Sequence, residues 1–473
     1  MRIFETLVLL INAALILWII LPLRKRPRWM LGLSIASIAT IALHLAIEHY
    51  RWQMLPSYGL SMLLLWLNYR RVFYPAPERS IQRIVSLALR GVVVLILFVI
   101  VALPIVFPVP ILPPLTGRFE VGTISVDMID PARDEIYTLD PDDKRQIIIQ
   151  LWYPADVAPD APRAPWIGDI AIGGPAIART LGLPGFLLDH IALARTHSVA
   201  SANVSDALPR YPVLVFSHGL GGLRNQNTFQ VEELASHGYI VVGIDHTYGA
   251  AVTVFADGRV ALFGDVLPSD PDDEAGFIRA AQTLVDVWAG DVQFVFDQLE
   301  RFNNGELDPR FADRIDLDRI GVLGHSTGAG AAVEVCYRDV RCKVGLGMDA
   351  WVIPTSDAAI DAGLSQPFLF MHSATWSTPG NAERFDRLYD NLKGHAYQMT
   401  IAGTRHYDFT DIPLFSPLAP WLGLKGPLDG ARVVDIINTY SLVFFDRYLK
   451  QDNTAVLNAT PADYPEVTFE SRP

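Results

Sequence analysis

Hydrophobic residues dominate the first 110 positions of the chain, where they form long, nearly uncharged stretches. Four such stretches can be delimited, at about 4–23, 29–47, 54–67 and 87–107. A helix needs about 20 apolar residues to cross the hydrocarbon core of a bilayer, so the third stretch, which is shorter and contains Pro56 and Gly59, is the weakest. The pattern predicts an all-α transmembrane domain of about four helices over residues 1–110.

The first apolar stretch has a second interpretation, a cleavable signal peptide. A signal peptide carries its positive charge before the apolar core and has small residues at a cleavage site after it. Here no such site follows the core, and the positive cluster comes after it, at Arg24, Lys25, Arg26 and Arg28. The order of these features favours a membrane anchor.

Loop charges predict the orientation of these spans, because Lys and Arg are retained on the cytoplasmic side. The loop at 24–28 carries four basic residues, whereas the loop at 48–53 carries only Arg51. The loop at 68–86 is again basic, with Arg70, Arg71, Arg79 and Arg83. We therefore expect an integral protein of the cell membrane, with everything after residue 110 on the extracytoplasmic side.

A proline-rich segment at 103–117 follows the last apolar stretch. It contains Pro104, Pro108, Pro110, Pro113 and Pro114. Such a run favours an extended, semi-rigid spacer of about 3 Å per residue. The part of the chain that follows is therefore expected to stay near the bilayer surface.

Residues 118–473 show a different pattern, in which short β-branched runs alternate with helical segments. This alternation predicts a mostly parallel sheet with helices on both faces. The segment Asp291–Phe302 has its apolar residues at helical spacing and should pack one face on the sheet. The predicted strands are 146–152, 213–217, 239–245, 319–325, 343–349, 367–372 and 396–402.

Charge separates the same two regions. The whole chain has 38 Lys and Arg against 51 Asp and Glu; residues 1–110 hold 11 against 3, which leaves 27 against 48 for the remainder. A basic, apolar beginning suits anionic lipid headgroups, whereas an acidic remainder is repelled by phosphate backbones. We therefore expect a membrane and a lipid or small ester as partners, and no nucleic acid.

The chain has two cysteines, Cys336 and Cys342. Outside the cytoplasm they are able to form a disulfide that closes a small loop, but sequence does not give their distance in space. Two ordinary buried thiols are the alternative.

The sequence Gly324-His325-Ser326-Thr327-Gly328 directly follows an apolar run that is typical of a buried strand. A G-x-S-x-G motif in this position predicts a nucleophile elbow, a strained turn between strand and helix that exposes the serine hydroxyl. Its two glycines permit the close approach of strand and helix. We therefore predict that Ser326 is a nucleophile, which needs a base, an orienting acid and oxyanion donors.

The oxyanion donors are predicted from an earlier strand, 213–217, which runs into His218-Gly219-Leu220-Gly221-Gly222. In α/β hydrolases one donor is a backbone N–H of this loop, and the other is the N–H after the nucleophile. These rules point to Leu220 and Thr327. His218 is interpreted as structural.

The base and the acid follow from the chain order Ser, acid, His. Among eleven histidines, His406 has the best position, because it follows the last predicted strand. Asp349 ends the strand after the elbow and is the expected acid. Asp245 precedes the serine and is interpreted as a surface-loop residue, and Asp408 is too near His406 in sequence to orient it.

Five ordered motifs together resemble those of the platelet-activating factor acetylhydrolase family, whose secreted type is often called lipoprotein-associated phospholipase A2. They are SHGLGG at 217–222, SHGYIVVGIDH at 236–246, GHSTG at 324–328, MDAWVIP at 348–354 and GTRHYDFTD at 403–411. The resemblance implies an α/β-hydrolase fold with a Ser326-Asp349-His406 triad. It also implies metal-independent, cofactor-free hydrolysis of short or oxidised acyl esters in phospholipids.

Two departures from the family pattern stand out. The mammalian enzyme has no four-span membrane domain, which implies a microbial type of architecture here. Thr327 stands where a bulky aromatic residue is familiar, which leaves the acyl specificity open.

Several interpretations stay open at this stage. The apolar segment 167–191 is either a lid that meets acyl chains or a core-packing helix. Residues 252–263 suggest a hairpin of unassigned role. The alternative functions are a broader esterase or polyester (cutinase-like) hydrolase, a peptidase, and a membrane sensor or transport partner whose hydrolase domain only binds a ligand.

Overall fold

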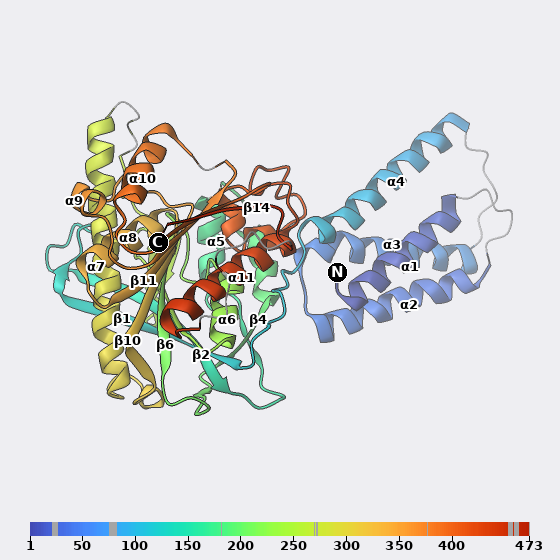
Figure 1. Ribbon diagram of the computed structural model, residues 1–473. Helices are drawn as coiled ribbons and strands as arrows, with labels where there is room; N and C mark the ends of the chain where they lie inside the picture. Colours follow the sequence, from blue (N-terminus) through green and yellow to red (C-terminus); the bar gives the residue numbers. More distant parts are fainter. Residues whose placement is uncertain are drawn as a thin grey trace. The chain divides into compact units, whose positions relative to one another are not determined.

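The computed structural model describes residues 1–20, 27–74, 83–180, 182–268, 270, 273–375, 377–452, 457 and 463–472. The chain forms two compact units (Figure 1). The first comprises Met1–Pro110, Phe186–Ala194 and Phe415–Leu418. The second comprises Ile111–Gly185, Arg195–Leu414 and Ala419–Pro473. The end of the first predicted span (21–23), Arg24, Lys25, Arg26 and Arg79 lie outside the described residues.

The first unit is helical over its described residues. It contains α1 (Ile3–Ile20), α2 (Trp29–Leu43) continued by a π-helical turn (His44–Glu48), a 3₁₀ turn (Trp52–Met54), α3 (Leu55–Phe73) and α4 (Arg83–Val106). Among the described residues, one helix, Trp29–Glu48, is both long and apolar enough to cross a membrane. The apolar helices Ile3–Trp18 and Arg90–Val106 are shorter. The four-span domain therefore stays a prediction.

Buried polar side chains explain why the third apolar stretch is weak. On α3, Ser57, Ser61 and Asn68 are buried inside the first unit. Asn12 Nδ2 donates to the Ser57 carbonyl (3.1 Å), and the hydroxyls of Ser37 and Ser61 lie 2.9 Å apart. Hydrogen bonds between small polar side chains hold helices together where the surroundings are apolar. The polarity of α3 thus serves helix packing.

The proline-rich segment is only partly the extended spacer that its sequence predicts. Residues 103–106 still belong to α4, with Pro104 inside the helix, and residues 108–116 have no regular structure. The later part is fixed to the second unit: His197 Nε2 lies 2.7 Å from the Pro113 carbonyl, and the Thr116 N–H donates to Glu233 (3.0 Å). Residues 103–106 thus agree with the predicted last apolar span, 87–107, which overlaps the predicted linker, and the linker as a whole stays a prediction.

The described residues of the second unit form a 12-stranded sheet. Its centre is a parallel series in the order β13-β12-β11-β10-β6-β7, flanked by antiparallel β14 and β2. The central strands are β6 (Tyr211–Ser217), β7 (Ile240–Asp245), β10 (Ile315–His325), β11 (Cys342–Met348), β12 (Phe368–Ser373) and β13 (Ala396–Ile401). The outer strands are β1 (Glu120–Asp134), β2 (Lys144–Asp156), β3 (Arg163–Pro165), β4 (Arg195–Ala200), β5 (Asn203–Val204) and β14 (Val467–Arg472). The mostly parallel sheet and all seven predicted strands are confirmed.

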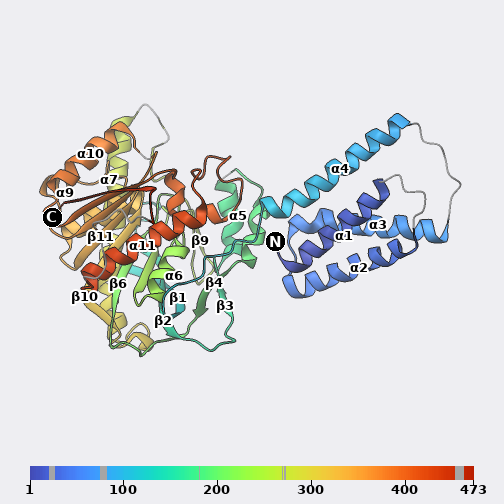
Figure 2. The ribbon, with the colours of Figure 1, turned by 45° about the vertical axis from the view of Figure 1, so that its right-hand side comes forward.

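Helices cover both faces of this sheet (Figure 1, Figure 2). Val213 and Val215 of β6 belong to the core on one face, and Leu214 and Phe216 belong to the core on the other. This is why central strands of parallel sheets read as unbroken apolar runs. The first face is covered by α7 (Glu274–Asn303), α8 (Thr327–Arg338), α9 (Asp357–Ala362) and α10 (Pro379–Asn391), and the second by α6 (Thr228–Ser236) and α11 (Gly430–Leu449). The predicted helix 291–302 is the second half of α7.

The two regions left open by the sequence have mixed character. Segment 167–191 contains α5 (Ile170–Thr180) and the start of a 3₁₀ helix (Gly185–Leu193). Ile170 is buried, whereas Ile172 and Phe186 are about half exposed. The predicted hairpin is present as β8 (Val252–Val254) and β9 (Val260–Leu262), which pair antiparallel.

A disulfide joins Cys336 to Cys342, with 5.1 Å between their Cα atoms. It connects the end of α8 to the start of β11, and both residues are buried. Of the two alternatives for these cysteines, the structure has the disulfide. The link ties together the helix that follows Ser326 and the strand that leads to Asp349.

Candidate active site

The loops after β6, β10 and β11 meet at one edge of the sheet. These three strands run parallel, and Gly324 pairs with both Ser217 and Gly347 in register. The carboxyl ends of parallel strands are where open α/β sheets bind their ligands. The residues that follow the three strands are therefore the first place to look for chemistry.

Ser326 occupies a sharp turn between β10 and α8. Its backbone has φ 54° and ψ −118°, a left-handed conformation that is unfavourable for a residue with a side chain. A Cβ at Gly324 would overlap the carbonyl group of Gly328, and one at Gly328 would overlap the carbonyl oxygens of Ser217 and His218. Both glycines of the motif are thus required by close backbone packing. The turn leaves Ser326 8% exposed.

Asp349 and His406 come together across the sheet edge. Nδ1 of His406 lies 3.1 Å from Oδ2 of Asp349. The second carboxylate oxygen of Asp349 accepts from the Ser373 N–H (2.5 Å), and Asp349 is fully buried. The His406 side chain keeps 18% of its surface exposed. This geometry orients the imidazole through Nδ1 and keeps part of the ring accessible to a substrate.

The backbone around Ser326 is fixed to the Asp349 loop on both sides. The Ser326 N–H donates to the Met348 carbonyl (2.9 Å), and the Trp351 N–H donates to the Ser326 carbonyl (3.0 Å). The His325 and His406 rings have centroids 4.4 Å apart. The three predicted catalytic residues therefore lie in one connected group of loops.

The predicted oxyanion donors lie beside this group. Thr327 is the first residue of α8, so its N–H has no acceptor within the helix. On the other loop, the Gly219 N–H donates to Gln226 Oε1 (3.3 Å) and the Gly221 N–H to the Gly249 carbonyl (2.9 Å). Within the described part of the chain, the Leu220 N–H between them has no such partner. Two amides are thus available for an oxyanion.

Two neighbouring residues have structural roles. Asp408 was set aside as an orienting acid, and its carboxylate accepts instead from the N–H groups of Arg405 (2.8 Å) and Gly426 (2.5 Å). His218 is buried with its ring edge-on to both His246 and Trp288, and burial beside His246 holds its pKa well below the ordinary value.

The interpretation of Asp245 as a surface-loop residue is wrong. It is fully buried at the end of β7 and forms an ion pair with Arg224, whose backbone N–H also donates to it (2.5 Å). A buried carboxylate needs such a partner to offset the loss of hydration. Its position after a strand did not reveal that partner, because Arg224 comes from the preceding loop.

A second set of serine, histidine and aspartate lies in the interior, and the sequence did not reveal it. Ser217 Oγ lies 2.8 Å from His246 Nε2, and His246 Nδ1 lies 2.9 Å from Asp291 Oδ2. All three residues are fully buried. Arg145 binds both oxygens of Asp291 (3.0 and 2.6 Å), and Arg133 binds one of them (2.8 Å). The His246 ring stacks on Trp288.

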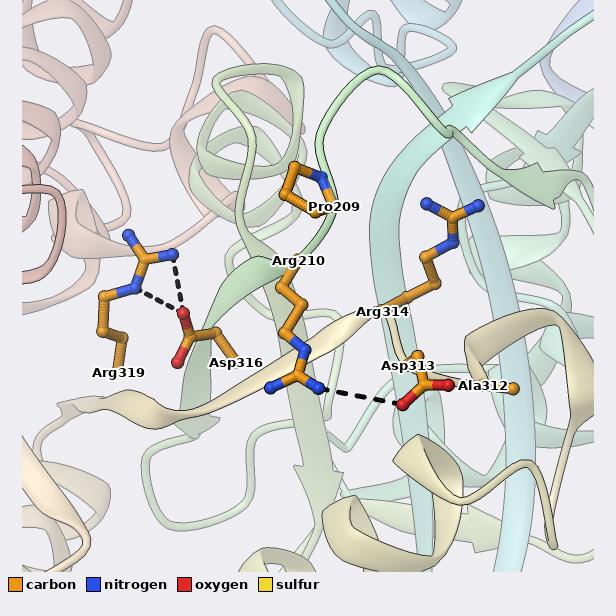
Figure 3. A pocket seen from close by; sticks show the side chains of 7 residues that line it. All are labelled: Pro209, Arg210, Ala312, Asp313, Arg314, Asp316 and Arg319. Atoms are coloured by element: carbon orange, nitrogen blue, oxygen red, sulfur yellow. Dashed lines mark hydrogen bonds and ion pairs between the residues drawn. The ribbon is translucent and has the colours of Figure 1, made fainter.

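One cavity of about 520 Å³ lies away from all of these residues, where β6 and β10 begin. Figure 3 shows that four of its charged side chains face one another in two pairs. Arg319 binds Asp316 (2.7 Å), and Arg210 reaches Asp313 (3.7 Å). The wall carries no nucleophile, and its residues are Pro209, Arg210, Ala312, Asp313, Arg314, Asp316 and Arg319.

Among the described residues, one group of side chains places its ligand atoms close enough to share a metal ion: Glu5, His44 and Glu48 in the first unit. Glu5 is already bonded to Arg2 (2.9 Å) and Arg51 (2.7 Å). Because the charges of this buried group are balanced, we assign no metal to it.

Comparison with solved structures and curated proteins relates the second unit to esterases. A ferulic acid esterase from Streptomyces cinnamoneus superposes with a TM-score of 0.63 at 28% identity, and the match covers 76% of this chain and 99% of that one. A platelet-activating factor acetylhydrolase of the dog is 30% identical over 269 residues, 51% of this chain and 57% of the dog protein. A probable 1-alkyl-2-acetylglycerophosphocholine esterase of Arthroderma benhamiae is 25% identical over 276 residues, 54% of this chain and 66% of that protein.

The chain thus spans somewhat more than half the length of the dog relative. The family model described as platelet-activating factor acetylhydrolase, isoform II, matches residues 105–263 and 274–464. This match includes the glycine-rich segments 218–222 and 324–328, Asp349 and His406. The chain belongs to the platelet-activating factor acetylhydrolase, isoform II, family.

Proposed function

We propose that this protein is a serine carboxylic-ester hydrolase that acts on short or oxidised acyl esters of phospholipids or similar lipids. Ser326 is the nucleophile, His406 the base and Asp349 the residue that orients the base. The observation that carries the proposal is the left-handed backbone of Ser326, held between two glycines that accept no side chain. Membership of the family and the Asp349–His406 hydrogen bond support it.

The proposed reaction has two halves. His406 Nε2 takes the proton of the Ser326 hydroxyl while its oxygen attacks the ester carbonyl, and the N–H groups of Leu220 and Thr327 bind the oxyanion. Collapse of this intermediate breaks the ester C–O bond, and His406 returns the proton to the leaving alcohol. Water then attacks the acyl-serine in the same way and releases the acid. Asp349 stabilises the imidazolium in both halves.

We further propose that the first unit is a four-span membrane anchor and that the second unit lies outside the cytoplasm. The apolar helix Trp29–Glu48, the two shorter apolar helices and the basic loops of the sequence support the anchor. The Cys336–Cys342 disulfide supports an oxidising compartment, since such bonds are rare in the cytoplasm.

The catalytic assignment is tested with purified full-length Ser326→Ala and, as a matched control, Ser217→Ala, which changes a buried serine at the end of β6. We expect Ser326→Ala to lose about 10³-fold or more in kcat on p-nitrophenyl acetate and on a short-acyl phospholipid. It should also lose labelling by a fluorophosphonate, while Ser217→Ala keeps both. Unchanged hydrolysis by Ser326→Ala would show that the nucleophile is wrong, and an inert wild-type serine would favour the ligand-binding alternative.

A broader esterase is the second candidate, because the ferulic acid esterase matches the fold over nearly its whole length. Thr327, which is small and borders the predicted acyl site, is compatible with a wider range of acyl groups. Relative kcat/KM for p-nitrophenyl acetate, long-chain esters, a polyester and short-acyl phospholipids in liposomes separates the two. A clear preference for the short-acyl phospholipid supports the lipid substrate, and equal use of all four supports the broader esterase.

A further inference from the structure

Gln226 lies in the loop between β6 and α6, and its side chain joins two loops of the candidate site. Oε1 accepts from the Gly219 N–H (3.3 Å), next to the predicted oxyanion donor Leu220. Nε2 donates to Nδ1 of His325 (3.1 Å), the residue before Ser326. The backbone carbonyl of Gln226 accepts from the Asp411 N–H (2.9 Å). The amide thus spans from the oxyanion loop to the elbow.

This hydrogen bond fixes the state of His325. Since Nδ1 accepts from the amide of Gln226, the ring proton lies on Nε2, which then donates to the His406 carbonyl (3.1 Å). Burial, with His406 close by, lowers the pKa of His325 well below its ordinary value, so the ring stays neutral. One continuous chain of hydrogen bonds therefore runs from the Gly219 N–H through Gln226 and His325 to the backbone of His406.

The packing around this chain leaves little freedom. A Cβ at Gly222 would overlap Oε1 of Gln226, and one at Gly219 would come within 2.9 Å of His325 Nδ1 and 3.3 Å of Ser326 Cβ. The glycine-rich loop is folded directly around the amide group. A change in the amide is therefore expected to move the loop that carries the Leu220 N–H relative to Ser326.

We propose that Gln226 is a positioning residue, which sets the oxyanion loop against Ser326 and His406 by holding His325 in one tautomer. This inference rests on the proposed function and assigns no contact between Gln226 and the substrate. If Gln226 positions the donor, its loss lowers kcat more than it raises KM, because a displaced oxyanion donor slows the chemical step more than it weakens substrate binding. A residue that only fills space would not produce this split.

The first variant is Gln226→Leu, which at similar volume removes the amide's hydrogen bonds to Gly219, to His325 and to Asn227 Oδ1 (3.1 Å). We expect kcat to fall by about 10- to 100-fold with KM within about twofold, and fluorophosphonate labelling of Ser326 to slow in parallel. The matched control is Gln298→Leu in α7, since Gln298 is buried and its side-chain oxygen accepts from Arg301 (2.9 Å). Equal kcat in the two variants at equal thermal stability would overturn the proposal.

The second variant, Gln226→Glu, decides the matter even where Gln226→Leu does not fold. When protonated, the introduced carboxyl group donates to His325 as the amide does, whereas the ionised carboxylate presents an acceptor to Nδ1 and disfavours the observed tautomer. We expect kcat relative to wild type to rise as the pH is lowered, an effect that Gln298→Glu lacks. Parallel pH profiles for Gln226→Glu and wild type would overturn the proposal. Activity that does not depend on Ser326 would instead overturn the proposed function.

Discussion

The inner set, Ser217, His246 and Asp291, is fully buried; the outer set, Ser326, His406 and Asp349, is partly exposed, and both contain the same three residue types. In both, a histidine Nδ1 lies about 3 Å from an aspartate oxygen (2.9 and 3.1 Å). The inner set is closed: each of its members is fully buried, and the serine belongs to a regular strand. The outer set is open at Ser326 and His406.

Charge is the second difference. Burial by itself would raise the pKa of Asp291, but the guanidinium group of Arg145, together with His246, holds it far below the ordinary range. Arg133 forms a further ion pair with the same carboxylate. Within the described residues, Asp349 forms no ion pair with lysine or arginine. An aspartate that is already neutralised has little charge left to stabilise an imidazolium, which a catalytic acid must do.

The backbone is the third difference. Ser326 is forced to φ 54°, and strain of about 1–3 kcal/mol at such a residue persists only when the surroundings impose it. The same turn begins α8 at Thr327, directly after Ser326. A hydrogen-bonded Ser-His-Asp series is therefore not sufficient evidence of catalysis. Three features separate the outer set from the inner one: the exposure of Ser326 and His406, a carboxylate at Asp349 without an arginine or lysine partner among the described residues, and the nearby N–H groups of Leu220 and Thr327.

Replacing each aspartate with asparagine tests the difference between the two sets most directly. In Asp349→Asn the imidazole loses its acceptor and its favoured tautomer, so we expect kcat to fall by about 10⁴-fold. The fold should be retained, because the Ser373 N–H keeps an acceptor. Initial rates on p-nitrophenyl acetate measure the loss of kcat, and thermal unfolding measures whether the fold is retained. A loss below about tenfold would show that Asp349 does not orient His406.

Asp291→Asn should act on stability. It leaves the buried Arg145 without the carboxylate that binds it through two nitrogens, and breaking a buried pair in this way costs about 3–5 kcal/mol. Denaturant titration of the purified variant measures the loss in free energy of unfolding. The molecules that remain folded should hydrolyse ester at nearly the wild-type rate per labelled Ser326. A specific loss of kcat with unchanged stability would assign chemistry to the inner set.

Ser217→Ala is the mildest of these changes. It removes one hydrogen bond to His246, and a typical net contribution of such a bond is about 1 kcal/mol. We expect a small decrease in the free energy of unfolding and kcat within about twofold of wild type. A fall in fluorophosphonate labelling comparable to that of Ser326→Ala would contradict the distinction drawn between the two serines.

The sequence predicted the central sheet because each of its strands is covered on both faces and therefore appears as an apolar run. It did not predict β14 (Val467–Arg472), an edge strand in which polar and charged residues interrupt the apolar ones. Ser326, Asp349 and His406 could be predicted from the G-x-S-x-G motif, the apolar strands before them and the chain order Ser, acid, His. The structure adds the hydrogen bond between Asp349 and His406, while their catalytic roles stay predictions.

Contacts between distant segments could not be predicted. The role of Gln226 depends on His325, and the burial of Asp245 depends on Arg224 in another loop. Residues 103–106 were placed both in the last apolar span, 87–107, and in the overlapping linker, and the structure has them in α4. A local sequence pattern indicates the chemistry of a side chain. It does not reveal the distant partner that determines the role of that side chain.

The inner set also predicts a response to pH. Burial lowers the pKa of His246 below its ordinary 6.5, since Asp291 is already matched by arginines. Below about pH 6.5 the unfolded chain therefore binds a proton at this site that the folded protein refuses. The contribution of His246 to stability is present above that pH and is lost on acidification, at up to about 1.4 kcal/mol per pH unit.

The measurement compares the free energy of unfolding of wild type and His246→Gln between about pH 7.5 and 5. Burial raises the pKa of Asp411 to about 7 and also that of Glu232, and these groups act in the opposite direction. Because both proteins contain them, they cancel in the difference. The stability advantage of wild type over the variant should shrink as the pH falls. A difference that stays constant across this range would mean that His246 binds its proton equally well in the folded and the unfolded protein. A difference that grows on acidification would mean that the folded protein stabilises the charged histidine, and either result would contradict the neutral inner set.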